Sequence, residues 1–359
     1  SVYFGSSCEK VYGKSLLQRK TMKIDIYTGD CLDSLKQLED QSINTCITSP
    51  PYFALRDYGV EGQLGLEETP KEFVDNLVNV FKEVKRVLRD DGTVWLNIGD
   101  SYGAQNGKGF NTNANVGSTN RSTEMQKKYG DISSHSTIQD RTGLPPKSLL
   151  GIPWRVAFAM QDDGWILRQD IIWNKPNPMP ESVKDRCTKA HEYIFLFSKS
   201  KKYYFDNEVI KEESVTVNSK GEIGKPNSAK NVGKSVEGVD GFDVRSGFKD
   251  MGAYEKRNKR SVWTVATKPF TEAHFATFPK ELILPCVLAG CPEGGTVLDP
   301  FAGSGTTGIV ANHKNRNAIL LELSEDYINI AVKRIRKEAG TLFLNLNIIR
   351  KKDESIKSI

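Results

Sequence analysis

The sequence has 359 residues, of which 38% are hydrophobic and 26% are charged, a balance that supports a buried core and excludes a disordered protein. No apolar run approaches the roughly 20 residues that cross a bilayer, so we expect no membrane span. The six cysteines lack Cys-x-x-Cys spacing and the four histidines lie far apart. We therefore predict no metal site and a reducing, cytoplasmic location.

The positive charge is concentrated in one segment. The formal net charge is +5, and residues 199–261 contribute +4 of it, because this stretch holds 14 Lys or Arg and 10 Asp or Glu. A local excess of basic residues favours an anionic partner that docks on this segment.

The first hundred residues alternate strand and helix signals. In chain order, the predicted elements are a strand at Lys23–Asp30, helical spacing at Cys31–Leu38, a strand at Ile43–Thr48, a helix from Thr69 to Leu88 and a strand at Thr93–Ile98. The long helix opens with a capping-box pattern and has its stop signal at Asp91-Gly92. Strands and helices joined by short connections are typical of a parallel sheet flanked by helices.

Two long polar segments interrupt this regularity. Gly103 to Thr142 is too long for an ordinary connection, so we expect a mobile loop with a binding role. Glu212 to Arg260 is poor in large apolar residues, which indicates an insertion or a small recognition module. Ordered elements are predicted around them: a helix at Ile152–Gln161, strands at Trp165–Trp173 and Glu192–Phe197, a helix at Phe278–Leu288, strands at Thr296–Asp299 and Asn317–Leu323, and a helix at Tyr327–Arg336.

A glycine-rich turn follows the strand Thr296–Asp299 and precedes a helix, with the sequence Asp-Pro-Phe-Ala-Gly-Ser-Gly-Thr-Thr. Such a turn lets the backbone pass close to a ligand while helix N–H groups face it. Two glycines separated by one residue also occur in plain tight turns, so this motif alone is weak. Glu322, at the end of the next strand, strengthens it, because a carboxylate there can accept both hydroxyls of a ribose.

A second motif, Ser49-Pro50-Pro51-Tyr52, follows the strand Ile43–Thr48. Two prolines fix the backbone into a rigid turn that holds a side-chain oxygen and a carbonyl in one place. Alone, this motif would be read as a turn that ends a strand. Its combination with the glycine turn points to a binding site.

Together the two motifs resemble those of the amino-group DNA methyltransferases that use S-adenosylmethionine, and the resemblance covers about Asp25 to Arg336. The Ser-Pro-Pro-Tyr motif precedes the glycine turn and the basic segment lies between them, an order similar to that of the β class. The resemblance implies an α/β fold with a Rossmann-like methyltransferase sheet, circularly permuted and mostly parallel, with an antiparallel edge hairpin. Loop insertions are expected to form a target-recognition region.

The expected divisions of the chain follow this resemblance. They are an N-terminal extension (1–22), a catalytic half (23–200) with the mobile loop 103–142, a target-recognition insertion (201–261), a cofactor-binding half (262–340) and a C-terminal tail (341–359).

The resemblance also implies roles for individual residues. The expected catalytic residues are Ser49, Pro50, Pro51 and Tyr52. The expected cofactor-binding residues are Asp30, Thr277, Phe278, Pro279, Asp299, Phe301, Ala302, Gly303, Ser304, Gly305, Thr306 and Glu322, with the backbone at Gly305 close to the cofactor. The target base is expected to stack on Tyr52 together with Phe53 or Trp173. The expected DNA contacts are Lys249, Lys256, Arg257, Lys259 and Arg260.

The implied reaction is direct methylation of an exocyclic amine on a base flipped out of double-stranded DNA. Ser49 Oγ and the Pro50 carbonyl can accept the two amino hydrogens and localise the nitrogen lone pair. Serine in the first position of the motif favours N4-cytosine, and N6-adenine is the alternative on the same fold. A non-catalytic DNA-binding protein is a third interpretation. The expected partners are double-stranded DNA and a cognate restriction endonuclease, with a monomer or homodimer as the assembly.

Overall fold

The computed structural model describes residues 21–103, 144–213, 216–217, 223–224, 256–268, 278–339 and 344–350. Nearly all of the predicted N-terminal extension and of the loop 103–142 lies outside these ranges. The chain divides into two units, one formed by Ser1–Phe205 with Ser261–Ile359 and the other by Asp206–Arg260. We call them the large unit and the small unit.

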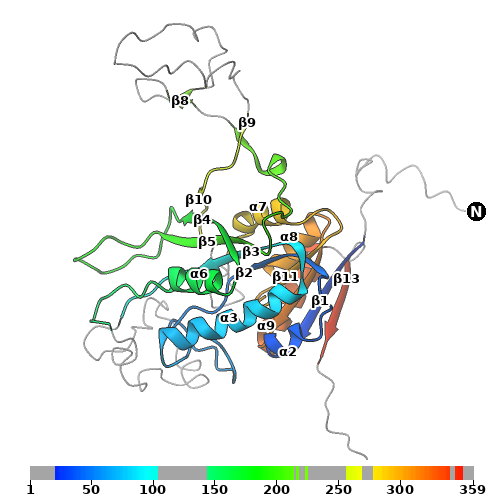
Figure 1. Ribbon diagram of the computed structural model, residues 1–359, viewed down its shortest axis with the longest axis horizontal. Helices are drawn as coiled ribbons and strands as arrows, with labels where there is room; N and C mark the ends of the chain where they lie inside the picture. The colour runs from blue at the N-terminus through cyan, green and yellow to red at the C-terminus, as the bar shows by residue number, and fades with distance from the viewer. Residues whose placement is uncertain are drawn as a thin grey trace, which may run out of the picture. The chain divides into compact units, whose positions relative to one another are not determined.

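The large unit is built on one sheet. Within the described residues its nine strands follow the order β10-β4-β5-β3-β2-β11-β12-β1-β13 (Figure 1). Strand β5 runs antiparallel to both of its neighbours, β3 and β4, and every other pair is parallel. The strands are β1 (Met22–Thr28), β2 (Ile43–Thr48), β3 (Leu88–Ile98), β4 (Ile166–Asn174), β5 (His191–Ser198), β10 (Val262–Thr264), β11 (Thr296–Asp299), β12 (Asn317–Glu322) and β13 (Leu344–Ile349).

Helices cover both faces of this sheet (Figure 1). On one face, α3 (Pro70–Val87) contacts both α2 (Cys31–Leu35) and α6 (Ile152–Asp162). On the other, α8 (Thr306–His313) contacts both α7 (Lys280–Gly290) and α9 (Glu325–Ala339). The predicted α/β class and the mostly parallel sheet with an antiparallel hairpin are confirmed, although β10 lies outside the β4–β5 hairpin and forms the actual edge. In the described part of the chain, no helix combines the length and the apolar character that a bilayer crossing needs.

Helix α3 shows how local sequence sets these elements. Thr69 Oγ1 accepts the backbone N–H of Glu72 at 3.2 Å, and the Glu72 carboxylate accepts the N–H of Thr69 at 3.2 Å, which is the predicted capping box. The apolar residues spaced along one face of the helix are buried in the core of the large unit: Phe73, Val74, Leu77, Val80, Phe81, Val84 and Val87.

The predicted ends of two helices are wrong. Helix α2 stops at Leu35, three residues early. The helix before β3 stops at Val87, because Leu88 is already extended and pairs with Ile43 in the sheet. Its supposed stop signal lies inside the strand, where a Cβ on Gly92 would stand 2.9 Å from the carbonyl oxygen of Arg89, so glycine serves a close backbone approach there.

The predicted C-terminal tail contains a strand. Residues 344–349 form β13, which pairs in parallel with β1, and Asn347 Nδ2 donates to Asp25 Oδ1 at 2.8 Å. Leu344, Asn345, Leu346 and Asn347 alternate between apolar and polar side chains, a strand pattern that the predicted tail overlooked.

The small unit falls within the predicted insertion 201–261. Its described residues form a 3-10 turn at Glu208–Ile210, a pairing of β6 (Glu212–Glu213) with β9 (Lys256–Arg257), and a pairing of β7 (Thr216–Val217) with β8 (Ile223–Gly224). Its role in target recognition stays a prediction.

A buried carboxylate joins three elements at the centre of the large sheet. Asp299, the last residue of β11, is 1% exposed. It accepts hydrogen bonds from Thr48 Oγ1 of β2 at 2.7 Å, from Thr307 Oγ1 of α8 at 2.6 Å and from the backbone N–H of Phe301 at 3.1 Å. Burial raises the pKa of Asp299 to about 6, although these three donors act in the opposite direction.

Substituting Asp299→Asn should change how stability depends on pH. The folded state holds the Asp299 proton more tightly than the unfolded chain, in which the pKa is near 3.8. Raising the pH from 4 to 7 therefore removes up to about 3 kcal/mol of unfolding free energy through this group. An amide fits the same donors because the Thr307 hydroxyl can also accept. Relative to the wild type, the variant should gain stability over this interval.

Urea unfolding at pH 4, 5, 6 and 7 measures this difference. Asp75→Asn is the control, because that carboxyl is 55% exposed and pairs with Lys71 on the surface of α3. A stability difference between Asp299→Asn and the wild type that stays constant across this range would contradict the assignment.

Candidate active site

One edge of the large sheet collects the residues predicted to carry chemistry. The parallel strands β1, β2, β11 and β12 all end at this edge. Strand β5 runs the opposite way and therefore begins there, with His191 and Glu192. The chain continues from β2 through α3 to β3 on one side and from β11 through α8 to β12 on the other, so the strand order reverses between β2 and β11. Ligands of open α/β sheets bind at such a reversal.

The glycine turn after β11 is left-handed at both glycines, with φ of 50° at Gly303 and 78° at Gly305. A Cβ on Gly303 would meet nothing within 4 Å, and its N–H donates to Glu322 Oε2 at 2.7 Å. A Cβ on Gly305 would stand 3.0 Å from the Cβ of Ala331 on α9. Gly303 therefore leaves room for a ligand, whereas Gly305 leaves room for a helix.

The Glu322 carboxylate is fixed by backbone donors on both sides. Besides the Gly303 N–H, it accepts the N–H of Ser324 at 2.9 Å. Burial raises the pKa of Glu322, and these backbone hydrogen bonds oppose that shift. Each carboxylate oxygen keeps a second acceptor position, so the group can still receive hydroxyls of a ligand.

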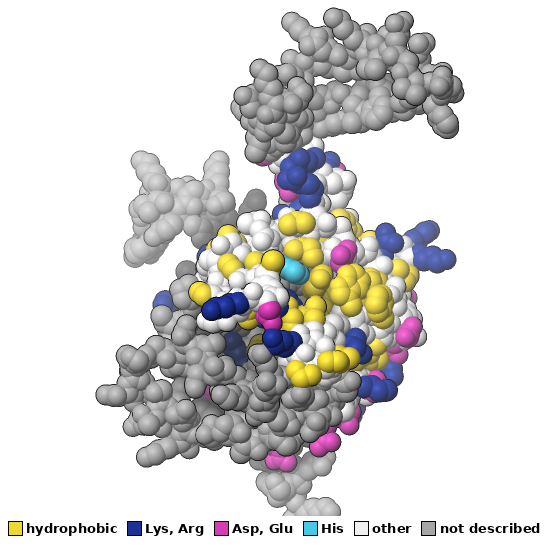
Figure 2. Space-filling model, turned by 90° about the vertical axis from the view of Figure 1, so that its left-hand side faces the viewer, with side chains coloured by type: hydrophobic (Ala, Val, Ile, Leu, Met, Phe, Trp, Pro, Cys, Tyr) yellow, Lys and Arg dark blue, Asp and Glu magenta, His cyan; other side chains and the backbone are white. Residues whose placement is uncertain are grey.

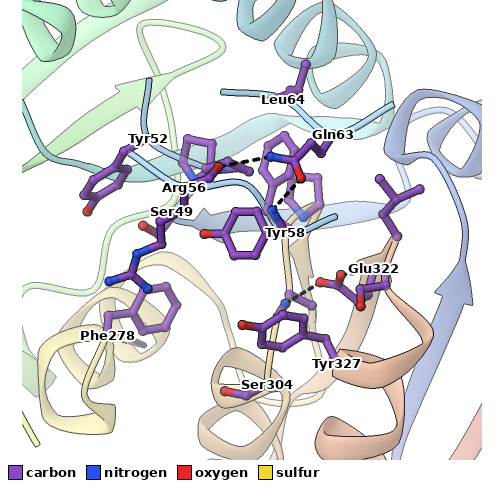
Figure 3. Close-up of a pocket in the computed structure, with 18 of the residues that line it drawn as sticks. Ser49, Tyr52, Arg56, Tyr58, Gln63, Leu64, Phe278, Ser304, Glu322 and Tyr327 are labelled. Carbon is purple, nitrogen blue, oxygen red and sulfur yellow. Dashed lines mark hydrogen bonds between the residues drawn. The ribbon is translucent and has the colours of Figure 1, made fainter. Parts of the chain in front are cut away.

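Both motifs open into one cavity of about 260 Å³. Figure 3 shows Ser49 and Tyr52 at one end of it and Glu322 with Tyr327 at the other. The predicted site residues that line it are Asp30, Ser49, Pro50, Pro51, Tyr52, Trp173, Phe278, Phe301, Ala302, Gly303, Ser304, Thr306 and Glu322. Residues more than 250 positions apart in the sequence thus share one cavity.

The Tyr52 side chain is held firmly at its end of the cavity. Its hydroxyl donates to Glu192 Oε2 at 2.6 Å. Its ring packs on Gly99, where a Cβ would stand 2.6 Å from Tyr52 Cε2. Burial first, and the Glu192 carboxylate second, raise the pKa of Tyr52 well above its ordinary value.

Sequence reasoning missed a segment that forms one wall of the cavity. After the Pro-Pro turn, the chain closes on itself through Ala54 N–H to the Gly65 carbonyl at 2.8 Å. Gln63 holds the segment from within, because its Oε1 accepts from the N–H of Tyr58 at 2.6 Å and its Nε2 donates to the Arg56 carbonyl at 3.1 Å. Figure 3 shows Arg56 extending from this segment toward Phe278, and the ring centre of Tyr58 lies 6.1 Å from that of Tyr327. The sequence of this segment has no helical or strand periodicity from which it could be predicted.

The prediction that a target base stacks on Phe53 is wrong. Phe53 is 2% exposed and packs in the core, with its ring 5.6 Å from that of Phe73. Trp173 is also buried, but it lines the cavity, and its indole N–H donates to the Val265 carbonyl at 2.8 Å. Tyr52 and Trp173 remain the aromatic residues from the prediction that face the cavity.

Several predicted cofactor residues act behind the cavity instead of in its wall. Asp299 links β2, β11 and α8, and Gly305 caps α8 against α9, so neither residue lines the cavity; the approach of the Gly305 backbone to the cofactor stays a prediction. Ser304 does reach the wall, but its hydroxyl accepts from Arg334 Nη1 at 2.6 Å. Pro279 precedes α7 and is buried, and Thr277 lies outside the described residues.

The predicted DNA contacts lie in the small unit. Arg257 Nε and Arg260 Nε both pair with Glu212 Oε1, at 3.1 and 2.8 Å. Lys256 is exposed, Lys259 is half-buried, and Lys249 lies outside the described residues. Figure 2 shows Lys and Arg side chains gathered on the described part of this unit. Two of the predicted cations thus share one carboxylate, which reduces their net charge.

Known proteins resemble this chain over most of its length. A protein family described as DNA methylase (N6_N4_Mtase) matches residues 43–333. The type II methyltransferase M.Cfr9I of Citrobacter freundii is 44% identical over 90% of each chain, and M.SmaI of Serratia marcescens is 42% identical over 89% of this chain and 93% of its own.

Solved structures share the fold. The PvuII DNA methyltransferase, described as cytosine-N4-specific, has a TM-score of 0.55 at 18% identity and covers 92% of this chain and 98% of its own. A protein of Thermus thermophilus, described as a putative DNA modification methylase and complexed with S-adenosyl-L-methionine, has a TM-score of 0.52 at 22% identity, with 90% and 98% covered. The family match and the identity to the type II methyltransferases confirm the resemblance read from the two motifs, and the chain belongs to the N6_N4_Mtase family of DNA methylases.

Proposed function

We propose that this protein transfers a methyl group from S-adenosylmethionine to the exocyclic N4 amino group of a flipped cytosine in double-stranded DNA. One observation carries the proposal. The Ser-Pro-Pro-Tyr turn and the glycine turn with Glu322 open into the same cavity, so an acceptor pair for an amine and a cradle for a nucleoside lie within one cavity.

The Glu322 end of the cavity fits the nucleoside part of S-adenosylmethionine. The bare Cα of Gly303 admits a ligand to the backbone, and Glu322 offers acceptors for two ribose hydroxyls. Phe301 supplies an apolar wall. Asp30 lines this cavity too, where the family resemblance places an adenine contact, although its Oδ1 already caps α2 by accepting the N–H groups of Leu32 and Asp33. When bound there, S-adenosylmethionine supplies an electrophilic methyl group on a sulfonium.

The other end fits an aromatic amine. The amine of a base is a poor nucleophile because its lone pair is delocalised into the ring. Ser49 Oγ and the Pro50 carbonyl can accept its two hydrogens, which favours a tetrahedral nitrogen whose lone pair points at the methyl carbon. Positioning of the two reactants supplies much of the remaining rate.

The identity of the base rests on Ser49. A hydroxyl at this position favours N4-cytosine, and the same arrangement could serve N6-adenine because a hydroxyl accepts either amine. We propose Tyr52 and Trp173 as the aromatic residues that flank the flipped base, with the small unit and the other insertions reading the DNA sequence.

A restriction endonuclease that cuts the same sequence is the partner that this role implies. We also propose that the motif order reflects a circular permutation of the methyltransferase sheet.

The proposed reaction is tested by identifying its product. Unmethylated double-stranded DNA of mixed sequence is incubated with the protein and S-adenosylmethionine, digested to nucleosides and analysed by mass spectrometry against standards. N4-methylcytosine is the expected product. N6-methyladenine would reject the role given to Ser49 in base choice, and the absence of any modified base would reject the enzymatic proposal.

Replacing Ser49 by Ala should lower kcat by at least about 100-fold, because the amine loses one of its two acceptors in a desolvated site. The dissociation constant for S-adenosylmethionine should stay within about twofold, since Ser49 lies at the opposite end of the cavity from Glu322. Transfer of a tritiated methyl group and isothermal titration calorimetry measure the two quantities. Ser42→Ala, on the exposed turn before β2, is the control. Full activity of Ser49→Ala would exclude the proposed amine pocket.

Replacing Glu322 by Gln should weaken S-adenosylmethionine binding about tenfold, which is about 1.4 kcal/mol, because a charged acceptor for two hydroxyls becomes a neutral one. Calorimetry with the unreacted cofactor measures it. Glu325→Gln is a matched control three residues along, where the carboxylate is exposed and pairs with Arg350. Equal affinities of the two variants would move the ribose site elsewhere.

A further inference from the structure

Four side chains form a polar cluster in the cavity wall at the Tyr52 end: Tyr52, Asn97, Lys175 and Glu192. The Glu192 carboxylate is its centre. Oε2 accepts from the Tyr52 hydroxyl at 2.6 Å and from Asn97 Nδ2 at 3.2 Å, and Oε1 pairs with Lys175 Nζ. The side chains of Glu192 and Lys175 are 15% and 18% exposed, so the pair is largely withdrawn from water.

The cluster draws on three strands and the Pro-Pro turn. Asn97 lies on β3, Glu192 is the second residue of β5, and Lys175 follows the last residue of β4. Because β5 is antiparallel to both β3 and β4, its first residues reach the edge where those two strands end. A carboxylate at the start of β5 is thereby placed beside the tyrosine that follows β2.

Lys175 compensates the charge of the partly buried Glu192 carboxylate and is itself fixed. Its Nζ lies 4.3 Å from the centre of the Trp173 ring, and the Trp173 indole N–H donates to the Val265 carbonyl at 2.8 Å. A cation over an aromatic face is attracted by the ring electrons. A buried carboxylate without such a partner would be costly, which explains why Lys175 accompanies Glu192.

The cluster is not needed to hold the strands β3, β4 and β5 together. The strands β3, β5 and β4 are already paired along the sheet by backbone hydrogen bonds. The cluster instead constrains the Tyr52 ring, because Glu192 holds its hydroxyl. A second constraint comes from Gly99, whose bare Cα lets the ring edge pack against the backbone. With both in place, Tyr52 has one orientation at its end of the cavity.

We propose that Glu192 is a positioning residue, which holds the Tyr52 ring as a preformed platform for the flipped base and is kept in place by Lys175. This inference rests on the proposed function, because it assumes that the Tyr52 end receives the base. A preformed platform spares the enzyme the ordering of an aromatic ring when the base arrives. Glu192 therefore acts through Tyr52 and not on the reacting atoms.

A double-mutant cycle tests this coupling. Glu192→Gln removes the charge at nearly constant shape, Tyr52→Phe removes the hydroxyl but keeps the ring, and the third variant combines them. Each single variant should lower kcat at least tenfold, and the double variant should be no worse than the poorer single one. The dissociation constant for S-adenosylmethionine should stay within twofold throughout. Glu83→Gln is the control, because Glu83 forms a partly buried ion pair with Arg86 on α3, and neither residue lines the cavity.

The outcomes are distinguishable. Wild-type kcat in Glu192→Gln, or single effects that multiply in the double variant, would overturn the inference while leaving the proposed function intact. Equal losses of cofactor affinity and of kcat would also overturn it, since they would indicate general disruption of the cavity. If the wild type itself modified no DNA, the proposed function would fail and the ring orientation would still be measurable.

That measurement uses fluorine NMR on protein labelled with 3-fluorotyrosine, in which the Tyr52 signal is identified by its absence from Tyr52→Phe. A 3-fluorotyrosine ring has two orientations that are related by a ring flip. In the wild type we expect one of them to predominate and to exchange slowly with the other. In Glu192→Gln the signal should shift and the exchange should be faster, and in Glu83→Gln the signal should not change. An identical Tyr52 signal in the wild type and Glu192→Gln would overturn the positioning role independently of any activity.

Discussion

The relative position of the two motifs depends on the hydrogen bond between Thr48 and Asp299. Thr48 is the last residue of β2 and directly precedes the Ser-Pro-Pro-Tyr turn, and Asp299 is the last residue of β11 and opens the glycine turn. The 2.7 Å bond between them is fully buried, where its electrostatic strength is greatest. Since Asp299 also accepts from Thr307 at the start of α8, one carboxylate sets where both turns leave the sheet. Slipping β2 by one residue would point Ser49 away from the cavity.

Much of the fold was accessible from sequence because its signals are local. The capping box at Thr69 marks the start of α3, and the buried residues of this helix recur at helical spacing. The short strands β1, β2, β11 and β12 are each followed by turn residues. Both motifs stand directly after strands, so a parallel sheet brings them to one edge. This reasoning located Ser49, Tyr52, Gly303 and Glu322 in what the structure shows to be one cavity.

The rest depends on tertiary packing that no local pattern encodes. Phe53 follows Tyr52 directly, yet one ring faces the cavity and the other packs against Phe73 in the core. Gly305 has the sequence context of a ligand-binding glycine, but α9 occupies the space beside it. Glu192 could be assigned to the site only with the direction of β5, because in a parallel arrangement the start of this strand would lie at the opposite edge of the sheet.

Asp299 and Glu192, two carboxylates near the cavity, differ in how their charge is compensated. Among the described residues, the donors to Asp299 are all neutral, two threonine hydroxyls and one backbone N–H, and burial outweighs them, which raises its pKa to about 6. Glu192 has a lysine within ion-pair distance, and that lysine lies over an aromatic ring. Methyl transfer to an amine moves a positive charge from sulfur to nitrogen, so a wall with excess charge of either sign would alter the energy of that step. Pairing Glu192 with Lys175 supplies a strong acceptor for the Tyr52 hydroxyl while adding no net charge to the wall.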